Sequence, residues 1–464
     1  MLAVFYNRMP LFLRSYADRL AQSPIWSRMA RGVFWVTFGA VISRGLGLIS
    51  SIVVARILGK AGFGEVAAIQ NTVVMLATFA GLGFGVVVTK FVAEFRNSDP
   101  QRVGRILALT TVVTVLSSLM ISVALACTAP WVATRMLAAP HLAAALRIGA
   151  ALLFFTGVNT VQITALSGFE SFKAAARINI ICSLINFPLV LVGTYFGGLN
   201  GALWAWVCSA GANCLLTQVA LRKECRQAGI IYCYKTFWRE RGLLGRFSLP
   251  VFLSGLSGTC VEWALTTALV NQPGGYSQLG LFNAAKQWSI LILYIPTTLS
   301  NVTFPILSNL LGNGQPGQFK KMIVHNSLLL AGTAIAVGVP VAIFSRYIMG
   351  IYGHGFAEGW LVLLAICGYS VLYASNIVVG QAIWTLNLIR AGVLLSFVRA
   401  AAMLLFWQFF AGKGAVGLAL TYLFTHVLQT AYQIPYVWFN ARALTSRPKK
   451  TEDLADLSGN TIVS

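Results

Sequence analysis

Long apolar segments occupy most of this 464-residue chain, in which 57% of the residues are hydrophobic and only 10% are charged. A helix that crosses a lipid bilayer needs ~20 mainly apolar residues, and twelve segments meet this requirement. They lie at residues 33–56, 64–88, 106–127, 144–167, 174–196, 199–221, 247–270, 279–304, 322–345, 357–384, 388–411 and 414–440. The sequence therefore predicts an all-α polytopic membrane protein with twelve transmembrane helices and no soluble domain of useful size.

Positive charge is concentrated on one side of the predicted membrane. A formal net charge of +22 would suggest nucleic-acid binding in a soluble protein. Here, however, 25 of the 34 Lys and Arg residues lie in the two tails and in the loops after even-numbered helices, against 6 in the odd-numbered loops. Loops rich in Lys and Arg stay in the cytoplasm. We therefore expect cytoplasmic termini, a cytoplasmic basic stretch at 222–246, and no nucleic-acid partner.

A weak internal repeat relates the two halves of the chain at an offset of 216 residues. Gly64 opens the second predicted helix as Gly280 opens the eighth, and Gly198 precedes the sixth helix as Gly414 precedes the twelfth. Because an even number of helices separates each pair, the two halves enter the membrane in the same orientation, as in transporters built from parallel repeats with the substrate between them. The predicted organisation is a basic cytoplasmic N-terminal tail (1–32), an N-lobe of helices 1–6 (33–221), a basic cytoplasmic linker (222–246), a C-lobe of helices 7–12 (247–440) and a cytoplasmic C-terminal tail (441–464).

Polar side chains form stripes along seven of the predicted helices, although a helix surrounded by lipid and apolar protein should be apolar on every side. Hydrogen-bonded helix packing explains a stripe on any single helix, whereas stripes on seven helices favour a shared water-filled cavity. Amide, hydroxyl and aromatic groups together suit a glycan. The candidate glycan-binding residues are Asn159, Asn283, Gln287, Tyr369, Tyr373, Asn376, Tyr422, Gln429 and Tyr432.

Three cations, Arg44, Lys286 and Arg399, lie within predicted spans together with the carboxylate of Glu262. Charges inside a membrane face a cavity, pair with each other or mark a functional site. Glu262 and Lys286 flank the same short loop, so an ion pair between them is one interpretation; coupling of transport through Glu262 is another. No second acid lies well inside a span, so two positive charges remain, and arginine does not lose its proton. An anionic ligand is therefore expected, and the three cations are candidates for binding a diphosphate.

Residue patterns typical of an enzyme are scarce. The chain has no phosphate-binding loop, no HExxH motif and no nucleophile beside a base, and its 12 acidic residues lie nearly all in tails and loops. The eight cysteines show no metal-binding spacing, and His325 and His426 are interpreted as packing residues. We therefore predict no catalytic residues, no metal and no cofactor.

The segment ARILGKAGFGEVAAIQ (55–70) resembles the polysaccharide transporters of the multidrug/oligosaccharidyl-lipid/polysaccharide (MOP) flippase superfamily, the family of O-antigen and exopolysaccharide flippases. The similarity continues through GLGFGVVVTKFVAEF (81–95), LSGFESFKAA (166–175), LGLFNAAKQW (279–288) and FPILSNL (304–310). The resemblance implies two lobes of helices, alternating access in the bacterial inner membrane, and outward flipping of an undecaprenyl-diphosphate-linked oligosaccharide for O-antigen, capsule or exopolysaccharide synthesis.

Two other branches of the superfamily fit less well. Lipid II flippases look similar over SRGLGLISSIVVARILG (43–59), a match that includes Arg44, but they carry an adjacent Arg and Asp where this chain has Ser50 and Ser51. The two additional C-terminal helices of those flippases are also missing. Multidrug exporters generally couple cations through intramembrane carboxylates, and the N-terminal half of this chain has none well inside a span.

The sequence thus predicts a monomeric flippase that acts among membrane lipids on a lipid-linked oligosaccharide, with a polysaccharide polymerase and glycosyltransferases as candidate partners. Two alternatives remain open. A cation-coupled exporter of small amphiphiles would use Glu262 as its coupling acid. A non-transporting scaffold would hold membrane glycosyltransferases through the basic stretch 222–246.

Overall fold

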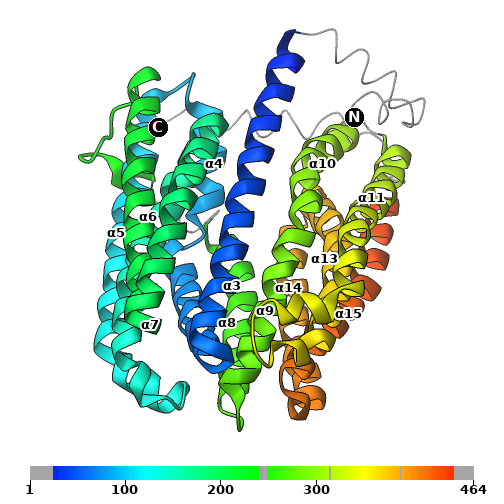
Figure 1. The fold of residues 1–464 in the computed structure, drawn as a ribbon. Helices are drawn as coiled ribbons and strands as arrows, with labels where there is room; N and C mark the ends of the chain where they lie inside the picture. The colour runs from blue at the N-terminus through cyan, green and yellow to red at the C-terminus, as the bar shows by residue number, and fades with distance from the viewer. Residues whose placement is uncertain (1–23, 241, 243–247, 313–314, 387, 444–464) are drawn as a thin grey trace. The chain divides into compact units, whose positions relative to one another are not determined.

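The computed structural model describes residues 24–240, 242, 248–312, 315–386 and 388–443. This part of the chain is built from helices and contains no β-strand (Figure 1). The all-α fold class predicted from the apolar segments is therefore confirmed. Most of the predicted N-terminal tail, the last part of the basic linker and nearly all of the C-terminal tail lie outside the described residues.

The first half of the chain forms long helical stretches, two of which contain a turn at a glycine. Gly59 has a φ of 69° within α3, and Gly198 has a φ of 55° within α7. Glycine adopts positive φ without a steric penalty, so each of these residues joins two helical segments. The elements are α3 (Pro24–Gly81), α4 (Phe84–Phe95), α5 (Pro100–Trp131), α6 (Ala143–Gly168) and α7 (Phe172–Gln227).

The described part of the second half contains eight α-helices, of which α12 is a short one. They are α8 (Leu249–Val270), α9 (Gly275–Ile292), α10 (Tyr294–Gly312), α11 (Pro316–Ile343), α12 (Ser345–Gly350), α13 (Trp360–Thr385), α14 (Ile389–Phe410) and α15 (Gly414–Ala443). A short 3-10 turn at Ala411–Lys413 joins the last two. The long helices begin and end close to the bounds that hydropathy predicts.

Two of the predicted spans are interrupted in the structure. The span at 64–88 breaks between α3 and α4, where Gly83 takes a φ of 71°. The span at 279–304 breaks at Leu293, and α9 and α10 are bent by 42° relative to each other. Pro296 explains the second break, because proline has no N–H to donate to the carbonyl four residues earlier. The assumption of an uninterrupted helix is therefore wrong in both places.

By length and hydropathy, seven helical stretches of the described chain are able to cross a membrane, and the bent pair α9–α10 is an eighth. Three of the seven, Gly39–Gly81, Phe172–Gln227 and Arg390–Ala441, each contain a turn and so hold two helices. The seven stretches therefore hold ten helices, and the bent pair α9–α10 and α8 bring the number to twelve. This number is consistent with the twelve spans predicted from the sequence.

The backbone repeats where the sequence repeat predicts it. Gly198 has φ and ψ values of 55° and −134°, and Gly414, its counterpart in the second half, has values of 56° and −129°. Each of the two glycines lies at the start of the last helix of its half. The halves therefore use the same turn at the same place, which supports a pseudo-symmetric pair of six-helix lobes.

Contacts between residues group the chain into two compact units. Unit 1 comprises Met1–Val54, Leu76–Ala129 and Ala143–Ser248. Its apolar core joins α4, α5, α6 and α7, and includes the buried side chains of Val92, Leu107 and Leu166. Within the predicted linker, the Glu240 carboxylate pairs with Arg105 at 3.2 Å and with Arg102 at 3.5 Å. These ion pairs hold the segment after α7 against the beginning of α5.

Unit 2 comprises Ala55–Met75, Pro130–Leu142 and Leu249–Ser464. In this unit the second segment of α3 crosses α9 at two glycines that the 216-residue repeat relates. A Cβ atom at Gly64 would overlap the backbone carbonyl of Tyr276, and one at Gly280 would overlap that of Lys60. Only glycine permits such a close approach of two helices. The crossing anchors a piece of the first half of the sequence within unit 2.

Candidate functional site

Four helices of unit 2 each carry a polar face at helical spacing. Residues three, four or seven apart lie on the same face of an α-helix. The faces consist of Ser254, Gly258 and Glu262 on α8, of Tyr369, Tyr373, Asn376 and Gly380 on α13, of Ser396 and Arg399 on α14, and of Tyr422, His426, Gln429 and Gln433 on α15. The stripes predicted on α13 and α15 are therefore real faces of continuous helices.

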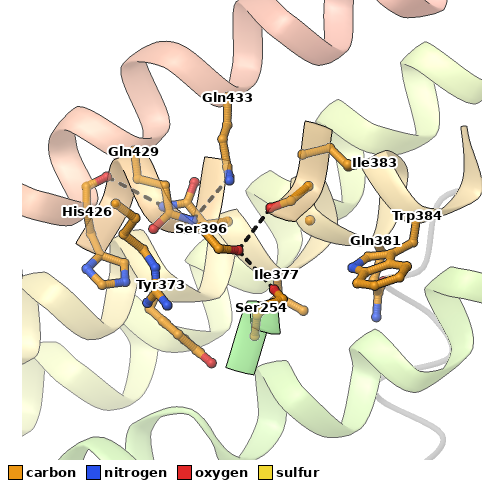
Figure 2. A pocket seen from close by; sticks show the side chains of 14 residues that line it. Ser254, Tyr373, Ile377, Gln381, Ile383, Trp384, Ser396, His426, Gln429 and Gln433 are labelled. Carbon is orange, nitrogen blue, oxygen red and sulfur yellow. Dashed lines mark hydrogen bonds between the residues drawn. The ribbon is translucent and has the colours of Figure 1, made fainter. Parts of the chain in front are cut away.

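A cavity of about 360 Å³ lies among these helices (Figure 2). In Figure 2, Ser254 and Ser396 point toward each other, and their hydroxyl oxygens are 3.0 Å apart. The volume falls in the range of about 300–1,000 Å³ that is common for small-molecule sites. The lining consists of Ser254, Tyr373, Asn376, Ile377, Gly380, Gln381, Ile383, Trp384, Gly392, Ser396, Arg399, His426, Gln429 and Gln433.

Arg399 is the cation of this cavity. Its guanidinium lies against Gly258 of α8, where an added Cβ would be 2.8 Å from Nη2. Within the described residues Arg399 makes no ion pair and no hydrogen bond, although the side chain is half-buried. Any side chain larger than glycine at position 258 would push the guanidinium aside. The sequence places an arginine here and leaves room for it on the facing helix.

Lys286 and Glu262 form an ion pair, with Nζ donating to Oε2 over 3.1 Å. The Lys286 ammonium also lies 5.3 Å from the centre of the Tyr422 ring. The side chains of Lys286 and Glu262 remain 32% and 40% exposed, so the pair borders open space rather than a sealed core. The structure thus shows the ion pair that was one of the two interpretations of Glu262.

A series of contacts between aromatic rings connects this ion pair with the lining of the cavity. The Tyr369 ring lies edge-on to His426 and to Tyr422, with centroid distances of 4.8 Å and 5.5 Å. Tyr373 lies 5.6 Å from His426 and lines the cavity itself. Tyr369 and Tyr422 are buried, at 9% and 3% exposure, and of these three tyrosines it is Tyr373 that lines the cavity.

The structure brings together part of the predicted set. Arg399, Tyr373, Asn376 and Gln429 line one cavity, and Lys286, Glu262, Tyr369 and Tyr422 form the cluster beside them. Asn283 and Gln287 are half-buried on α9 and do not belong to the cavity lining. Tyr432 donates its hydroxyl proton to the carbonyl of Leu395 at 3.2 Å.

Two predicted residues belong to unit 1. Arg44 is half-buried on α3. Asn159 is buried on α6 and donates through Nδ2 to Oδ1 of Asn213 on α7, at 3.2 Å. Thr217 donates to the same Asn213 oxygen at 3.0 Å. Asn159 therefore takes part in hydrogen-bonded helix packing, which is the alternative explanation of a polar stripe, and not in the lining of the cavity.

Several lining residues were not among the predicted site residues: Ser254, Gln381, Trp384, Ser396, His426 and Gln433. Three of them carried a signal in the sequence. His426 lies four residues after Tyr422, Gln433 four residues after Gln429, and Trp384 four residues after Gly380, so each extends a face that was already recognised. Gln381 lies next to Gly380 on α13, and no predicted stripe included it.

The site has the chemistry of noncovalent binding. It offers one arginine, several amides and hydroxyls, and aromatic surface. Among the described residues no group of three or more His, Cys, Asp or Glu side chains could hold a metal ion. A ligand that fits this lining combines negative charge with hydrogen-bonding groups and is small enough, at least in part, for the cavity.

The fold is that of MOP-superfamily transporters. The structure matches an inward-facing multidrug resistance MATE family transporter of that superfamily with a TM-score of 0.74 and 17% identity, over 87% of this chain and 96% of that one. A MOP-superfamily transporter from Pyrococcus furiosus matches with a TM-score of 0.67 and 17% identity, over 90% and 96% of the two chains. At this level of identity the likeness concerns the fold alone.

Similarity in sequence shows to which family within this superfamily the chain belongs. Residues 29–311, more than half of the chain, match the polysaccharide biosynthesis protein family, and the chain belongs to that family. The EPS I polysaccharide export inner membrane protein EpsE of Ralstonia nicotianae is 26% identical over 82% of this chain and 88% of its own length. The lipid III flippase of Escherichia coli is 23% identical over 61% of this chain and 68% of its own length. The resemblance found in the sequence motifs is thus confirmed.

Proposed function

We propose that this protein is a flippase, and not an enzyme, that moves an undecaprenyl-diphosphate-linked oligosaccharide from the cytoplasmic to the periplasmic leaflet of the bacterial inner membrane by alternating access. Both termini would lie in the cytoplasm, as the distribution of Lys and Arg predicts. Membership of the polysaccharide biosynthesis protein family supports the proposal. So do relatives named as a polysaccharide export inner membrane protein and as a lipid III flippase.

The observation that carries the proposal is Arg399 in the cavity of unit 2. Its guanidinium has no acidic partner within 4 Å among the described residues, and a cation inside a transmembrane bundle is expensive unless a ligand or a partner neutralises it. Arginine binds phosphate oxygens through two parallel hydrogen bonds. A diphosphate headgroup therefore fits this position, while the polar lining of the cavity would receive sugar hydroxyls.

Lys286 and Arg44 have secondary roles in the proposal. Lys286 is paired with Glu262, so it would meet the diphosphate only if the ligand shares or replaces the carboxylate. Arg44, in unit 1, is a candidate through its match to the flippase motif. Because Arg399 is unpaired in the described chain and Lys286 is not, substitution of Arg399 should impair transport more than substitution of Lys286.

The test is flipping of a fluorescent undecaprenyl-diphosphate oligosaccharide in proteoliposomes. Wild-type protein should move the lipid between leaflets, and Arg399→Leu protein reconstituted at the same density should not. Export of small amphiphiles that depends on Glu262 would instead favour a cation-coupled exporter. If wild-type protein moves neither kind of molecule, the scaffold interpretation gains over both.

A further inference from the structure

The segment 230–240, which follows α7, places three large apolar side chains on the surface of unit 1. Residues 230–233 are extended, residues 234–236 form a turn, and Phe237–Glu240 form a 3-10 helix. The side chains of Ile231, Tyr234 and Trp238 are 78%, 55% and 54% exposed. All three lie in the predicted linker, outside the apolar segments that are predicted to cross the membrane. Lipid tails around a span therefore do not account for their exposure.

Packing and ion pairs hold this segment against α5. Ile230 is buried in the core of unit 1, and Tyr232 packs against that core. A Cβ atom at Gly104 of α5 would overlap the carbonyl of Ile231, so glycine at this position lets the segment lie directly on the helix. The ion pairs of Glu240 hold the other end of the segment. The three apolar side chains are thus displayed on a firm support.

The same end of unit 1 carries positive charge. Exposed cations lie in the last turns of α7 and in the segment itself: Arg222, Lys223, Arg226, Lys235 and Arg239. None of the five forms an ion pair in the described part of the chain. The two acids of residues 222–240 are engaged elsewhere, because Glu224 accepts a hydrogen bond from the Ser171 hydroxyl at 2.6 Å and Glu240 pairs with two arginines of α5. The five cations therefore remain available to an anionic partner.

The contact with α5 places the segment at the edge of the membrane. Gly104 lies two residues before 106–127, the apolar segment that is predicted to cross the bilayer. Since a helix rises about 1.5 Å per residue, the backbone of Ile231 meets α5 about 3 Å outside that segment. The headgroup region on each side of the hydrocarbon core is about 5–8 Å thick. Ile231 therefore lies at the depth of the lipid headgroups.

We propose that residues 231–239 form an anchor that binds anionic phospholipids of the cytoplasmic leaflet. Tryptophan and tyrosine are enriched where membrane and water meet, and each Lys or Arg close to an anionic leaflet strengthens binding about fivefold. In the anchor, the three apolar side chains insert between lipid headgroups, and Lys235 and Arg239 contact lipid phosphates. This inference goes beyond the proposed function, because the lipid bound here belongs to the surrounding membrane and is not the molecule that is moved. The anchor sets the depth at which the cytoplasmic ends of α5 and α7 lie.

Photo-crosslinking in inner-membrane vesicles that contain the full-length protein identifies what covers the anchor. Benzoylphenylalanine in place of Tyr234 should crosslink to phospholipid, which mass spectrometry of the purified protein detects. The same photo-reactive residue in place of Met120, an exposed side chain within the predicted span 106–127, is the positive control for lipid. A crosslink from position 234 to another protein would overturn the proposal and favour the scaffold interpretation. The absence of any crosslink at position 234, when position 120 reacts with lipid, would overturn it as well.

A lipid titration tests the role of the charges. Phosphatidylglycerol is added to the detergent-solubilised full-length protein and bound lipid is followed by native mass spectrometry, with phosphatidylcholine as the lipid without net charge. The double variant Lys235→Gln/Arg239→Gln should bind phosphatidylglycerol at least about tenfold more weakly than wild type, and phosphatidylcholine equally well. The matched control Arg135→Gln/Arg147→Gln removes two exposed arginines elsewhere and should change the affinity less than about twofold, because salt screens distant charges.

Equal losses in the two double variants would mean that the lipid responds to net charge alone, and the anchor would be refuted. An unchanged affinity of Lys235→Gln/Arg239→Gln for phosphatidylglycerol would refute it too. All four substituted side chains are exposed, so both double variants should fold, and thermal unfolding checks this.

Discussion

Unit 1 and unit 2 contain the same kinds of polar side chain in the middle of their helices, but they use them differently. In unit 1, Asn213 on α7 accepts hydrogen bonds from Asn159 on α6 and from Thr217, so the amides link two helices. In unit 2, Gln429 and Gln433 bond along a single helix and face a cavity. Unit 2 also links helices through an amide, since Thr430 on α15 donates to Oδ1 of Asn376 on α13 at 3.1 Å, so what distinguishes unit 2 is the cavity that its polar faces line.

The two units also differ in how they carry charge. In unit 1, Glu240 of the predicted linker pairs with Arg102 and Arg105 near the beginning of α5. In unit 2, the pair of Glu262 and Lys286 lies within the helices, and Arg399 adds a charge with no acid within ion-pair distance in the described chain. Charge at a helix end is easily solvated, whereas charge along a span needs a partner or a ligand.

The largest effect is expected from Arg399→Leu, which should lower flipping of the lipid-linked oligosaccharide by at least about tenfold, because charge-assisted hydrogen bonds are worth about 1.5–3 kcal/mol. Arg399 makes no ion pair in the described structure, so the thermal stability of the variant should be at or above that of wild type. Initial flipping rates in proteoliposomes measure the effect. Arg147→Leu, an exposed arginine of unit 1, is the matched control and should change little.

A second prediction concerns the ion pair of unit 2. Glu262→Gln should lower the free energy of unfolding by about 2 kcal/mol because it leaves the Lys286 ammonium unpaired; pairs that are fully buried lose about 3–5 kcal/mol. The smaller value reflects the exposure of the two side chains, 40% for Glu262 and 32% for Lys286. Adding Lys286→Met should restore most of the loss. Denaturation in mixed micelles measures each step.

Strict additivity of the two substitutions would contradict this prediction, because it would mean that Glu262 and Lys286 do not interact. Transport by the same variants separates the alternatives for function. If the double variant still flips the lipid, the pair is structural. If both Glu262→Gln and the double variant fold normally but lose transport, Glu262 takes part in coupling.

The third prediction compares amides in the two units. Asn213→Leu should lower the free energy of unfolding by about 1–2 kcal/mol, because it leaves the buried amide of Asn159 without its acceptor. Flipping per folded molecule should not change. Gln429→Leu should do the opposite, with unchanged stability and reduced flipping. Equal losses of stability in both variants would show that the amides of both units serve helix packing.

The sequence predicted those features that depend on local pattern. Apolar segment length and glycine positions were sufficient for the all-α fold class and for the shared turn at Gly198 and Gly414. The spacing of Tyr373, Asn376 and Gln429 was sufficient to mark faces that do line one cavity with Arg399. Helical periodicity carries this information without any knowledge of tertiary packing.

Other features depend on how segments distant in sequence meet, and hydropathy does not report them. The break at Gly83 was missed because average hydropathy is insensitive to a positive φ. Residues 55–75 pack with the second half of the chain because Gly64 and Gly280 allow two helices to touch. Gln381 belongs to no predicted stripe, and its place in the cavity lining became apparent only in the structure.

The smallest effect is expected at the end of unit 1. Glu240→Gln should lower stability by about 1 kcal/mol, because the two arginines that lose the carboxylate, Arg102 and Arg105, are 35% and 22% exposed near the beginning of a helix and can be hydrated instead. Raising the salt concentration from about 0.1 M to about 1 M shortens the Debye length from about 10 Å to about 3 Å, and should remove most of the difference between Glu240→Gln and wild type. The coupling between Glu262 and Lys286 should persist at the same salt concentration, since the ions would have to enter the helix bundle to screen it. If both effects vanish together, the charges of unit 2 are as open to solvent as those of unit 1, and the contrast between the two units fails.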